Sequence, residues 1–352
     1  MKVSEEELQK RIEDALRSCL ENVPFLEIGS VQVETRENEM QPDLLVELEL
    51  SGRKQTLVIE AKRSGHPRLA RDAANQLLRY KERYPEAYGV FAAPFVSPKA
   101  AEICSREEIG YVDLSGNCRL CFDRTYIEKQ GNPNRFAEKR DLRTLYSPKA
   151  QRVLRALLSN PKKSWKTKDL SEQAQVSAGQ VSNVKKLLAD REWIRIEPDG
   201  FVLSDPEALL KEWAENYSYK KNHIRNFYTL KPTAEFEADL ASTCTMENLT
   251  YALTSFSGAA RLAPAVRQQK VIAYVEESGV DLASLLALKE VPSGANISLL
   301  APYDEGVFYG VREIDGTRVA SPIQIYLDLL GSRGRGEEAA AALLEEVIRP
   351  QW

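Results

Sequence analysis

The chain has 352 residues, of which 43% are apolar and 28% charged, so it is long enough for two or three globular domains of ordinary size. Lys plus Arg (48) against Asp plus Glu (52) gives a net charge of −4, which excludes a globally basic, histone-like protein. No run of about 18 apolar residues predicts a membrane span, and the amino terminus lacks the apolar core of a signal peptide. We therefore expect a cytoplasmic protein without a membrane partner.

The five cysteines are spread from Cys19 to Cys244, and their number is odd, so we do not expect a disulfide framework. Cys118 and Cys121 form a single CxxC pair. A structural zinc site needs four ligands, whereas no second pair follows and both histidines lie far away in the sequence. Alternate faces of one strand explain the pair as well as a metal or redox role does.

The first part of the chain alternates helix-like and strand-like patterns. Ser4 is a candidate N-cap, and Leu8, Ile12, Leu16 and Leu20 then mark one face of a first helix. Strands are predicted at 31–35, 44–50, 56–61, 89–95, 111–114 and 118–126, and further helices at 69–84 and 98–108. This order predicts a mixed sheet with flanking helices over residues 1–132.

The second part begins with short helices. They are predicted at 148–158, at 168–175 with Thr167 as the cap, and from a cap at Ser177 to Leu188. A two-stranded ribbon over 193–197 and 201–203 follows. This is the order of a winged helix-turn-helix, which we assign to residues 140–215.

The last part has apolar runs at 271–275, 297–300 and 307–311, interpreted as strands, and helical stretches, of which 337–348 is the clearest. It predicts a third domain, of α/β type, at 230–352. The expected fold class is therefore α/β and multi-domain.

Charge is distributed unevenly along the chain. Residues 135–195 contain fifteen Lys/Arg and six Asp/Glu, a net charge of +9. Residues 233–352 contain nine Lys/Arg and seventeen Asp/Glu, a net charge of −8. A basic block inside an acidic protein is typical of a nucleic-acid interface, although a solvated linker would also be charged.

Three charged residues of the first part form a candidate catalytic set. Asp43 opens one predicted strand, and Glu60 ends the next, so a tight hairpin would place these carboxylates side by side. Two adjacent carboxylates can hold Mg²⁺, and Lys62 could position or deprotonate the attacking water and offset phosphate charge. Asp, Glu and Lys in this arrangement are suited to cleaving phosphodiesters.

Pro42-Asp43 followed by Glu60-Ala61-Lys62, inside this order of elements, resembles the PD-(D/E)xK nuclease superfamily, of restriction-endonuclease-like fold. Gln76 and Tyr80, at i and i+4, are similar to the QxxxY element of its RecB-like members. The resemblance implies that Asp43, Glu60 and the Ala61 carbonyl bind Mg²⁺ or Mn²⁺. Some members add an acid from the first helix, for which Glu13, Glu21 and Glu27 are alternatives. There are two other interpretations of Asp43, Glu60 and Lys62: a surface salt-bridge cluster, or the relic of a catalytic site in a domain that only binds DNA.

The helix that begins at Ser177 is the candidate DNA-reading element. Val176, Val181, Val184 and Leu188 should face the core, which leaves small and polar residues outward. Gln, Asn and Ser near a helix start suit base edges, and lysines suit phosphates. The candidate DNA-binding residues are Lys162, Lys163, Lys166, Lys168, Ser177, Gln180, Ser182, Asn183, Lys185, Lys186 and Arg195. Winged helices also dock proteins, which is the alternative.

The third part has no convincing catalytic site. The small-residue turn at 255–260 matches no phosphate-loop pattern, and close helix packing explains it better. Three segments, at 303–309, 321–329 and 333–338, resemble the carboxy-terminal region of AbiEi-family proteins, which are antitoxins of type IV toxin–antitoxin systems and winged-helix transcriptional regulators. The resemblance covers roughly residues 140–352 and departs from the shorter antitoxins in the nuclease-like module ahead of it.

These observations predict a DNA-binding regulator or antitoxin whose partners are duplex DNA and a cognate toxin held by the acidic domain. An active Mg²⁺-dependent endonuclease of host defence, targeted by the winged helix, is the rival prediction. An interaction scaffold is the third.

Overall fold

The computed structural model describes residues 5–21, 23, 26–33, 41–50, 52–136, 145–263, 270–332 and 335–352. The chain forms two compact units, one built mainly from residues 1–139 and the other mainly from residues 140–352. The predicted cap Ser4 and the predicted strand end at Thr35 lie outside the described residues.

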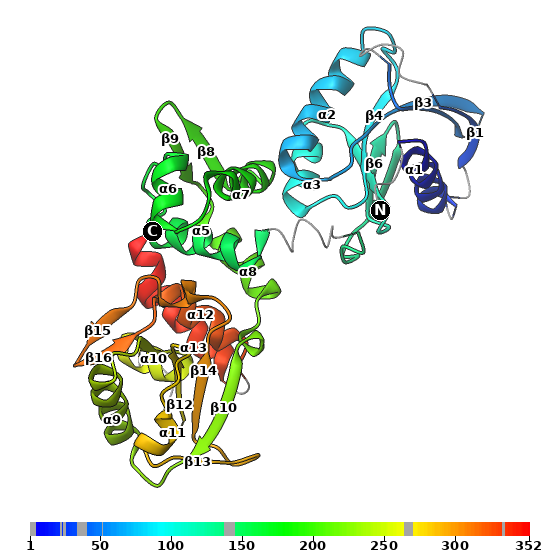
Figure 1. The fold of residues 1–352 in the computed structure, drawn as a ribbon. Helices are drawn as coiled ribbons and strands as arrows, with labels where there is room; N and C mark the ends of the chain where they lie inside the picture. The colour runs from blue at the N-terminus through cyan, green and yellow to red at the C-terminus, as the bar shows by residue number, and fades with distance from the viewer. Residues whose placement is uncertain are drawn as a thin grey trace. The chain divides into compact units, whose positions relative to one another are not determined.

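The first unit is a seven-stranded sheet with helices on both faces (Figure 1). Its elements are α1 (Glu5–Leu20), β1 (Leu26–Val33), β2 (Leu44–Leu50), β3 (Arg53–Ala61), α2 (Pro67–Tyr80), β4 (Tyr88–Ala93), α3 (Pro98–Arg106), β5 (Gly110–Asp113), β6 (Cys118–Phe122) and β7 (Thr125–Lys129). The strands lie side by side in chain order. β3, β4 and β5 are parallel, and the other neighbours are antiparallel. The carboxyl ends of the three parallel strands therefore share one edge of the sheet.

Two apolar cores hold this unit together, one on each face of the sheet. Ile12 and Leu16 of α1 pack with Leu57 and Ile59 of β3 on one face. Val58, which alternates with them along β3, packs against α2 and α3 on the other face. The period of two along a strand thus sends successive side chains to different helices, which fixes the register of β3.

Two local predictions in this unit are wrong. Residues 118–126 form a hairpin of two strands, because Asp123 adopts a left-handed conformation (φ 49°) and reverses the chain. Cys19 and Cys118 form a disulfide, since the end of α1 lies beside β6 although 99 residues separate them. Cys121 is exposed while Cys118 is buried, as expected for opposite faces of a strand.

The second unit begins with helices and a ribbon, which are α5 (Pro148–Ser159), α6 (Thr167–Gln173), α7 (Ala178–Asp190), β8 (Ile194–Glu197) and β9 (Gly200–Leu203). Ser177 caps α7 as predicted, because its hydroxyl accepts a hydrogen bond from Gln180 N at 3.2 Å. The predicted cap Thr167 is instead the first residue of α6, whose N-cap is Lys166. Trp165 adds a bridge to Phe201 of β9.

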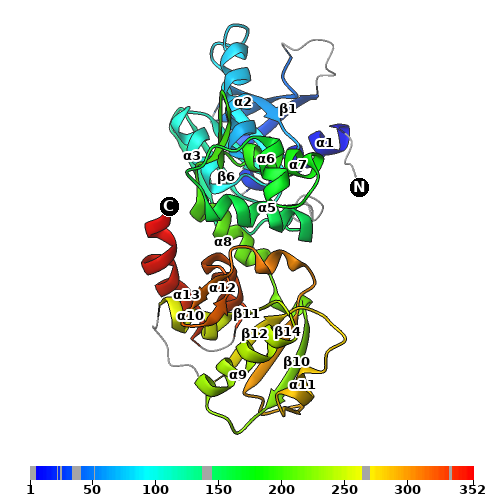
Figure 2. The same cartoon turned by 60° about the vertical axis from the view of Figure 1, so that its left-hand side comes forward.

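A second seven-stranded sheet completes this unit, with the strand order β13-β10-β14-β12-β11-β16-β15 (Figures 1 and 2). Its strands are β10 (His223–Tyr228), β11 (Tyr251–Leu253), β12 (Val271–Val275), β13 (Lys289–Glu290), β14 (Ile297–Ala301), β15 (Arg312–Ile314) and β16 (Thr317–Val319). The helices are α8 (Pro206–Asn216), η1 (Tyr219–Lys221), α9 (Thr233–Met246), α10 (Ser255–Leu262), α11 (Leu282–Leu285), η2 (Glu305–Phe308), α12 (Pro322–Leu330), α13 (Gly336–Leu343), η3 (Leu344–Ile348) and η4 (Arg349–Gln351).

β10 belongs to this sheet although it precedes residue 230. The strand predicted at 307–311 is wrong, because Asp304 accepts a hydrogen bond from Gly306 N at 2.8 Å and begins the short helix η2 there. The helix predicted at 337–348 is present as α13 and its continuation η3.

The central helix α12 is buried on all sides. A helix that is enclosed in this way must satisfy its polar side chains internally. Gln324 and Asp328, one turn apart on α12, therefore become the centre of a polar network inside the second unit.

Candidate functional site

The two predicted carboxylates lie opposite each other at the start of β2 and the end of β3. Leu44 pairs with Ile59 across the two strands, and Asp43 N donates to Ile59 O at 3.1 Å, which places Asp43 opposite Glu60. Both residues are buried, with exposures of 1% and 0%. Directly opposed residues of an antiparallel pair have their Cβ atoms about 5 Å apart, so the tight hairpin brings two acids together inside the protein.

Hydrogen bonds join Glu60 to Lys62 and Tyr80, and Lys62 in turn to Gln76. Lys62 Nζ donates to Glu60 Oε1 at 2.7 Å and to Gln76 Oε1 at 2.5 Å. The Tyr80 hydroxyl donates to Glu60 Oε2 at 3.0 Å, and Asp43 Oδ2 accepts from Ala61 N at 2.7 Å. The structure thus brings together all five residues that the sequence singled out, and we call them the acidic cluster.

α2 supplies two of these contacts because Gln76 and Tyr80 are one turn apart and face the sheet. The Lys62 side chain is 18% exposed, whereas that of Glu60 is fully buried. The cluster therefore opens to solvent on its lysine side, at the sheet edge formed by the ends of β3, β4 and β5.

The residue of α1 that reaches the acidic cluster is Gln9, which the sequence interpretation missed. Its Nε2 lies 3.4 Å from the carbonyl oxygen of Asp43, and the side chain is buried. Glu13 forms an ion pair with Arg17, Glu21 is an exposed turn residue, and Glu27 lies in β1. Gln9 shares the apolar helix face with Ile12 and Leu16. A polar residue on an apolar face was the sequence signal that could have identified it.

The donors at this site suit a hard divalent cation. Carboxylates from Asp43 and Glu60 and the backbone carbonyl of Ala61 are oxygen ligands of the kind that Mg²⁺ and Mn²⁺ prefer. Among the described residues, no group of three or more His, Cys, Asp or Glu side chains could hold a metal ion. A cation here would therefore depend on the carbonyl oxygen and water in addition to the two acids.

The outward face of α7 is small and polar, and lysines surround it. Val181, Val184 and Leu188 are buried, as the helical period predicts. Ser177, Ser182, Asn183 and Lys186 are exposed, and Lys185 is half-buried. Gln180 departs from the prediction, because it is half-buried and its Nε2 is enclosed without a hydrogen-bond partner among the described residues.

The other predicted cations lie before α7 and on the ribbon. Lys162, Lys163, Lys166 and Lys168 are exposed, in the turn before α6 and at its first residues. Arg195 is exposed on β8 and pairs with Glu197 of the same strand at 3.1 Å. All the predicted DNA-binding residues thus lie on α6, on α7 or its cap, in the turn before α6 or on the ribbon. Residues 139, 140 and 143 of the basic block lie outside the described part of the chain.

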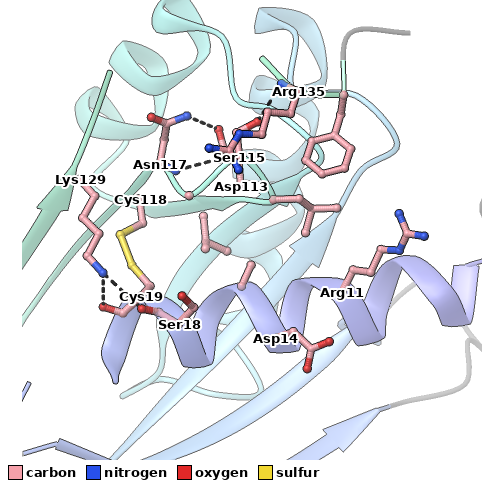
Figure 3. A pocket seen from close by; sticks show the side chains of 15 residues that line it. Arg11, Asp14, Ser18, Cys19, Asp113, Ser115, Asn117, Cys118, Lys129 and Arg135 are labelled. Atoms are coloured by element: carbon pink, nitrogen blue, oxygen red, sulfur yellow. Dashed lines mark hydrogen bonds between the residues drawn. A yellow bond between two sulfur atoms is a disulfide. The ribbon is translucent and has the colours of Figure 1, made fainter. Parts of the chain in front are cut away.

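A pocket of about 460 Å³ lies between α1 and the turn that follows β5 (Figure 3). Asp113 accepts hydrogen bonds from the Asn117 backbone and side chain, both at 2.9 Å. Lys129 Nζ lies 3.2 Å from the carbonyl oxygens of Ser18 and Cys19, at the end of α1. Since these polar groups are satisfied by the protein itself, the lining is interpreted as a joint between α1 and the sheet.

A second buried polar cluster, which the sequence did not reveal, lies in the second unit. Asp328 accepts hydrogen bonds from the hydroxyls of Tyr217 (2.8 Å), Tyr274 (2.9 Å) and Thr254 (2.5 Å) and from Gln324 Nε2 (3.1 Å). Arg155 of α5 in turn donates to Gln324 Oε1 through Nε (3.1 Å) and Nη2 (2.6 Å). We call these six residues the Asp328 network.

Burial governs the electrostatics of the Asp328 network. Loss of solvation raises the pKa of Asp328, and it raises the pKa values of Tyr217 and Tyr274 well above their ordinary range, with the nearby Asp328 charge as the next cause. The hydroxyls therefore stay protonated and donate to the carboxylate. The carboxylate at its centre is buried, and the network joins α5 to α12.

The small-residue turn of the third part is a packing feature, as predicted. A Cβ on Gly258 of α10 would lie 2.7 Å from Ile325 Cδ1 of α12. A side chain there would force Ile325 to shift, so close packing of α10 against α12 explains the turn without a phosphate site. Of the resemblance segments, Arg333 and Gly334 lie outside the described residues.

Comparison with known proteins connects the carboxy-terminal part of the chain with a family of regulators. A family model described as "Transcriptional regulator, AbiEi antitoxin, Type IV TA system" matches residues 202–349. The match begins within β9, so residues 140–201 of the expected span lie outside it. No curated protein and no solved structure gives a significant match to the chain. In the described part of the chain, no helix has both the length and the apolar character to cross a membrane.

Proposed function

We propose that this protein is a DNA-binding transcriptional regulator of the AbiEi antitoxin type, in which α7 of a winged helix reads duplex DNA. The observation that carries the proposal is the face of α7, where buried valines leave serine, asparagine and lysine side chains outward. The family match over residues 202–349 supports the regulator class. The order of helices and ribbon supports the winged helix.

The chemistry of this face suits a major groove. Asn183 and Ser182 offer hydrogen-bond donors and acceptors to base edges, and the small residues Ala178 and Gly179 permit close approach of the helix. The exposed lysines before and on α6 would neutralise phosphates, which supplies most of the affinity and makes it salt-dependent. The acidic carboxy-terminal domain would hold the protein partner, a toxin with a basic surface.

The test is equilibrium binding of the full-length protein to genomic DNA fragments, with Asn183→Ala and Lys186→Ala compared side by side. Asn183→Ala is expected to lower the preference for the best fragment over mixed-sequence DNA by roughly tenfold. Lys186→Ala is expected to weaken binding to all fragments by the same factor. Equal binding of every variant to every fragment would contradict the proposal.

A second function, a Mg²⁺-dependent DNA endonuclease directed by the same winged helix, is favoured by the acidic cluster. Two opposed buried carboxylates next to an ammonium at a sheet edge are costly to maintain for structure alone. The resemblance to PD-(D/E)xK nucleases gives the cluster a chemical purpose. A bound divalent cation would lower the pKa of water and offset phosphate charge there.

Each residue of the acidic cluster has a role in this second function. Asp43 and Glu60 would bind the cation through carboxylate oxygens, with Ala61 contributing its carbonyl. Lys62 would hold the attacking water against the scissile phosphate, and Gln76 fixes the position of its ammonium through the 2.5 Å hydrogen bond. Tyr80 orients Glu60.

The test is cleavage of supercoiled, linear and single-stranded DNA with Mg²⁺, Mn²⁺ or EDTA. Lys62→Ala and Asp43→Ala should abolish cutting while leaving duplex binding intact, because neither residue lies on the α7 face. Metal-independent cutting, or cutting that survives Asp43→Ala, would contradict a role for the cluster. If the wild type binds DNA without cutting it, only the regulator proposal remains.

A further inference from the structure

Two buried aromatic residues pair through their backbones near the turn of the ribbon in the second unit. Trp165 pairs with Phe201 of β9 as a short antiparallel bridge, with N–O distances of 2.8 and 3.1 Å between the two backbones. Both rings are almost fully buried. A Cβ on the neighbouring Gly200 would lie 2.5 Å from the carbonyl oxygen of Trp165, so this pairing requires glycine there.

Each ring holds the ammonium group of a different lysine. Lys163 Nζ lies 3.8 Å from the centroid of the Trp165 ring, and Lys185 Nζ lies 5.0 Å from that of Phe201. Lys163 comes from the turn between α5 and α6, whereas Lys185 comes from α7. Cations within about 6 Å of a ring centroid are attracted by the electron-rich ring face. Two residues whose backbones are bridged therefore each hold a cation, one from the turn before α6 and one from α7.

The tryptophan is not explained by hydrogen bonding. Its indole Nε1 is buried and has no partner among the described residues. An aliphatic side chain would fill a core position without an unsatisfied donor, so the indole ring must contribute something else. Tryptophan has the strongest cation-binding face of the aromatic residues, and Lys163 lies over that face.

We propose that Trp165 and Phe201 are positioning residues, which hold Lys163 and Lys185 ready for two phosphates of bound DNA. The inference rests on the proposed DNA binding and adds which lysines dominate it. A lysine loses much side-chain freedom when it binds a phosphate, and a ring that already restricts the ammonium lowers this cost. Lys163 and Lys185 should thus contribute more to affinity than freely moving lysines do.

The chain supplies matched controls at the adjacent positions. Lys162 and Lys186 are exposed neighbours of the two held lysines, and neither makes a ring contact among the described residues. Replacing any of the four by alanine removes one positive charge, and the two members of each pair are adjacent in the same turn or helix. A difference within each pair therefore measures the ring and not the charge.

The first experiment measures binding of the four alanine variants to a fluorescent mixed-sequence duplex over a salt series. Lys163→Ala and Lys185→Ala should each weaken binding roughly tenfold and lower the salt slope by about one. Lys162→Ala and Lys186→Ala should cost about threefold. Equal losses within each pair would overturn the inference while leaving DNA binding in place, whereas no salt-dependent binding by the wild type would overturn both.

The second experiment tests whether the rings act through the lysines. Trp165→Leu should weaken binding about threefold with the salt slope unchanged, and Trp165→Phe, which keeps a ring, should restore part of the loss. In a Lys163→Ala background, Trp165→Leu should cost nothing further. A Trp165→Leu loss of the same size in both backgrounds would show a merely structural ring and overturn the proposal. Thermal melting checks that each variant is folded.

Discussion

The acidic cluster and the Asp328 network are both buried polar groups, yet they are built on opposite plans. Asp328 is a single carboxylate enclosed by neutral donors from four side chains. The acidic cluster places two carboxylates opposite each other and beside an ammonium whose side chain is partly exposed. The Asp328 network satisfies one carboxylate with hydrogen bonds, whereas the acidic cluster gathers several charges where the protein opens to solvent.

We interpret this difference as one between a structural site and a site suited to binding a cation. When a buried carboxylate accepts all its hydrogen bonds from the protein itself, those bonds exist only in the folded state and therefore stabilise it. Two adjacent acids repel unless a cation or proton intervenes, so they suit a site that binds one. We therefore expect the Asp328 network to govern stability and the acidic cluster to contribute little to it.

The largest effect is expected from Asp328→Ala. It leaves the hydroxyls of Tyr217, Tyr274 and Thr254 without their shared buried acceptor, which should cost about 3–5 kcal/mol of unfolding free energy. Urea unfolding followed by tryptophan fluorescence measures it. Asp328→Asn, which keeps the volume, is the control and should cost less. An unchanged midpoint for Asp328→Ala would remove the contrast between the two clusters.

Arg155→Met should have the next largest effect. Arg155 is 1% exposed, and its loss leaves Gln324 Oε1 without the two donors it accepts from, at a cost of about 1–3 kcal/mol. The methionine fills much of the volume, which limits the loss of packing. The same urea experiment applies. A more stable variant would mean that the desolvation of Arg155 outweighs its hydrogen bonds.

Asp43→Asn should change stability by less than about 1.5 kcal/mol, because it relieves the repulsion between opposed acids while keeping an acceptor for Ala61 N. The wild type should gain thermal stability on addition of Mn²⁺, and the variant should not. Calorimetry with and without Mn²⁺ measures both. Destabilisation of the size expected for Asp328→Ala would make the acidic cluster structural.

The smallest effect on unfolding free energy is expected from an exposed ion pair, that of Glu207 with Arg349 and Lys211. Hydrogen bonds from Arg349 and then Lys211 lower the pKa of Glu207 to about 2. A lowered pKa stabilises the fold above the ordinary value of 4.5, and this contribution is lost as the pH falls from about 4.5 to about 2. Because solvent screens these groups, Glu207→Gln should cost less than about 1 kcal/mol at pH 7. Urea unfolding of the variant and the wild type at pH 7 and pH 3 measures the difference, which should shrink at the lower pH.

The elements that sequence reasoning predicted best are those set by local pattern. β2 and β12 occupy the expected residues, 44–50 and 271–275, because apolar runs bounded by turns leave little freedom. The acidic cluster was predictable because a hairpin of fixed register makes two acids neighbours. The buried face of α7 followed from the helical period.

What escaped the sequence depends on contacts between distant residues. The Asp328 network joins side chains from Arg155 to Asp328, and the disulfide joins Cys19 of α1 to Cys118 of β6. Gln9 was missed because an acid was expected at its place. The run at 307–311 is apolar enough for a strand, but capping by Asp304 makes it begin as a helix.

Equilibrium binding to a fluorescent duplex over a salt series, with the Lys185→Ala/Lys186→Ala double variant beside the wild type, tests the central claim of DNA binding through α7 most directly. The account predicts that the logarithm of affinity falls linearly with the logarithm of salt concentration, and that the double variant binds more weakly with a slope lower by about two. Binding that is insensitive to salt, or a double variant that binds as tightly as the wild type, would contradict it.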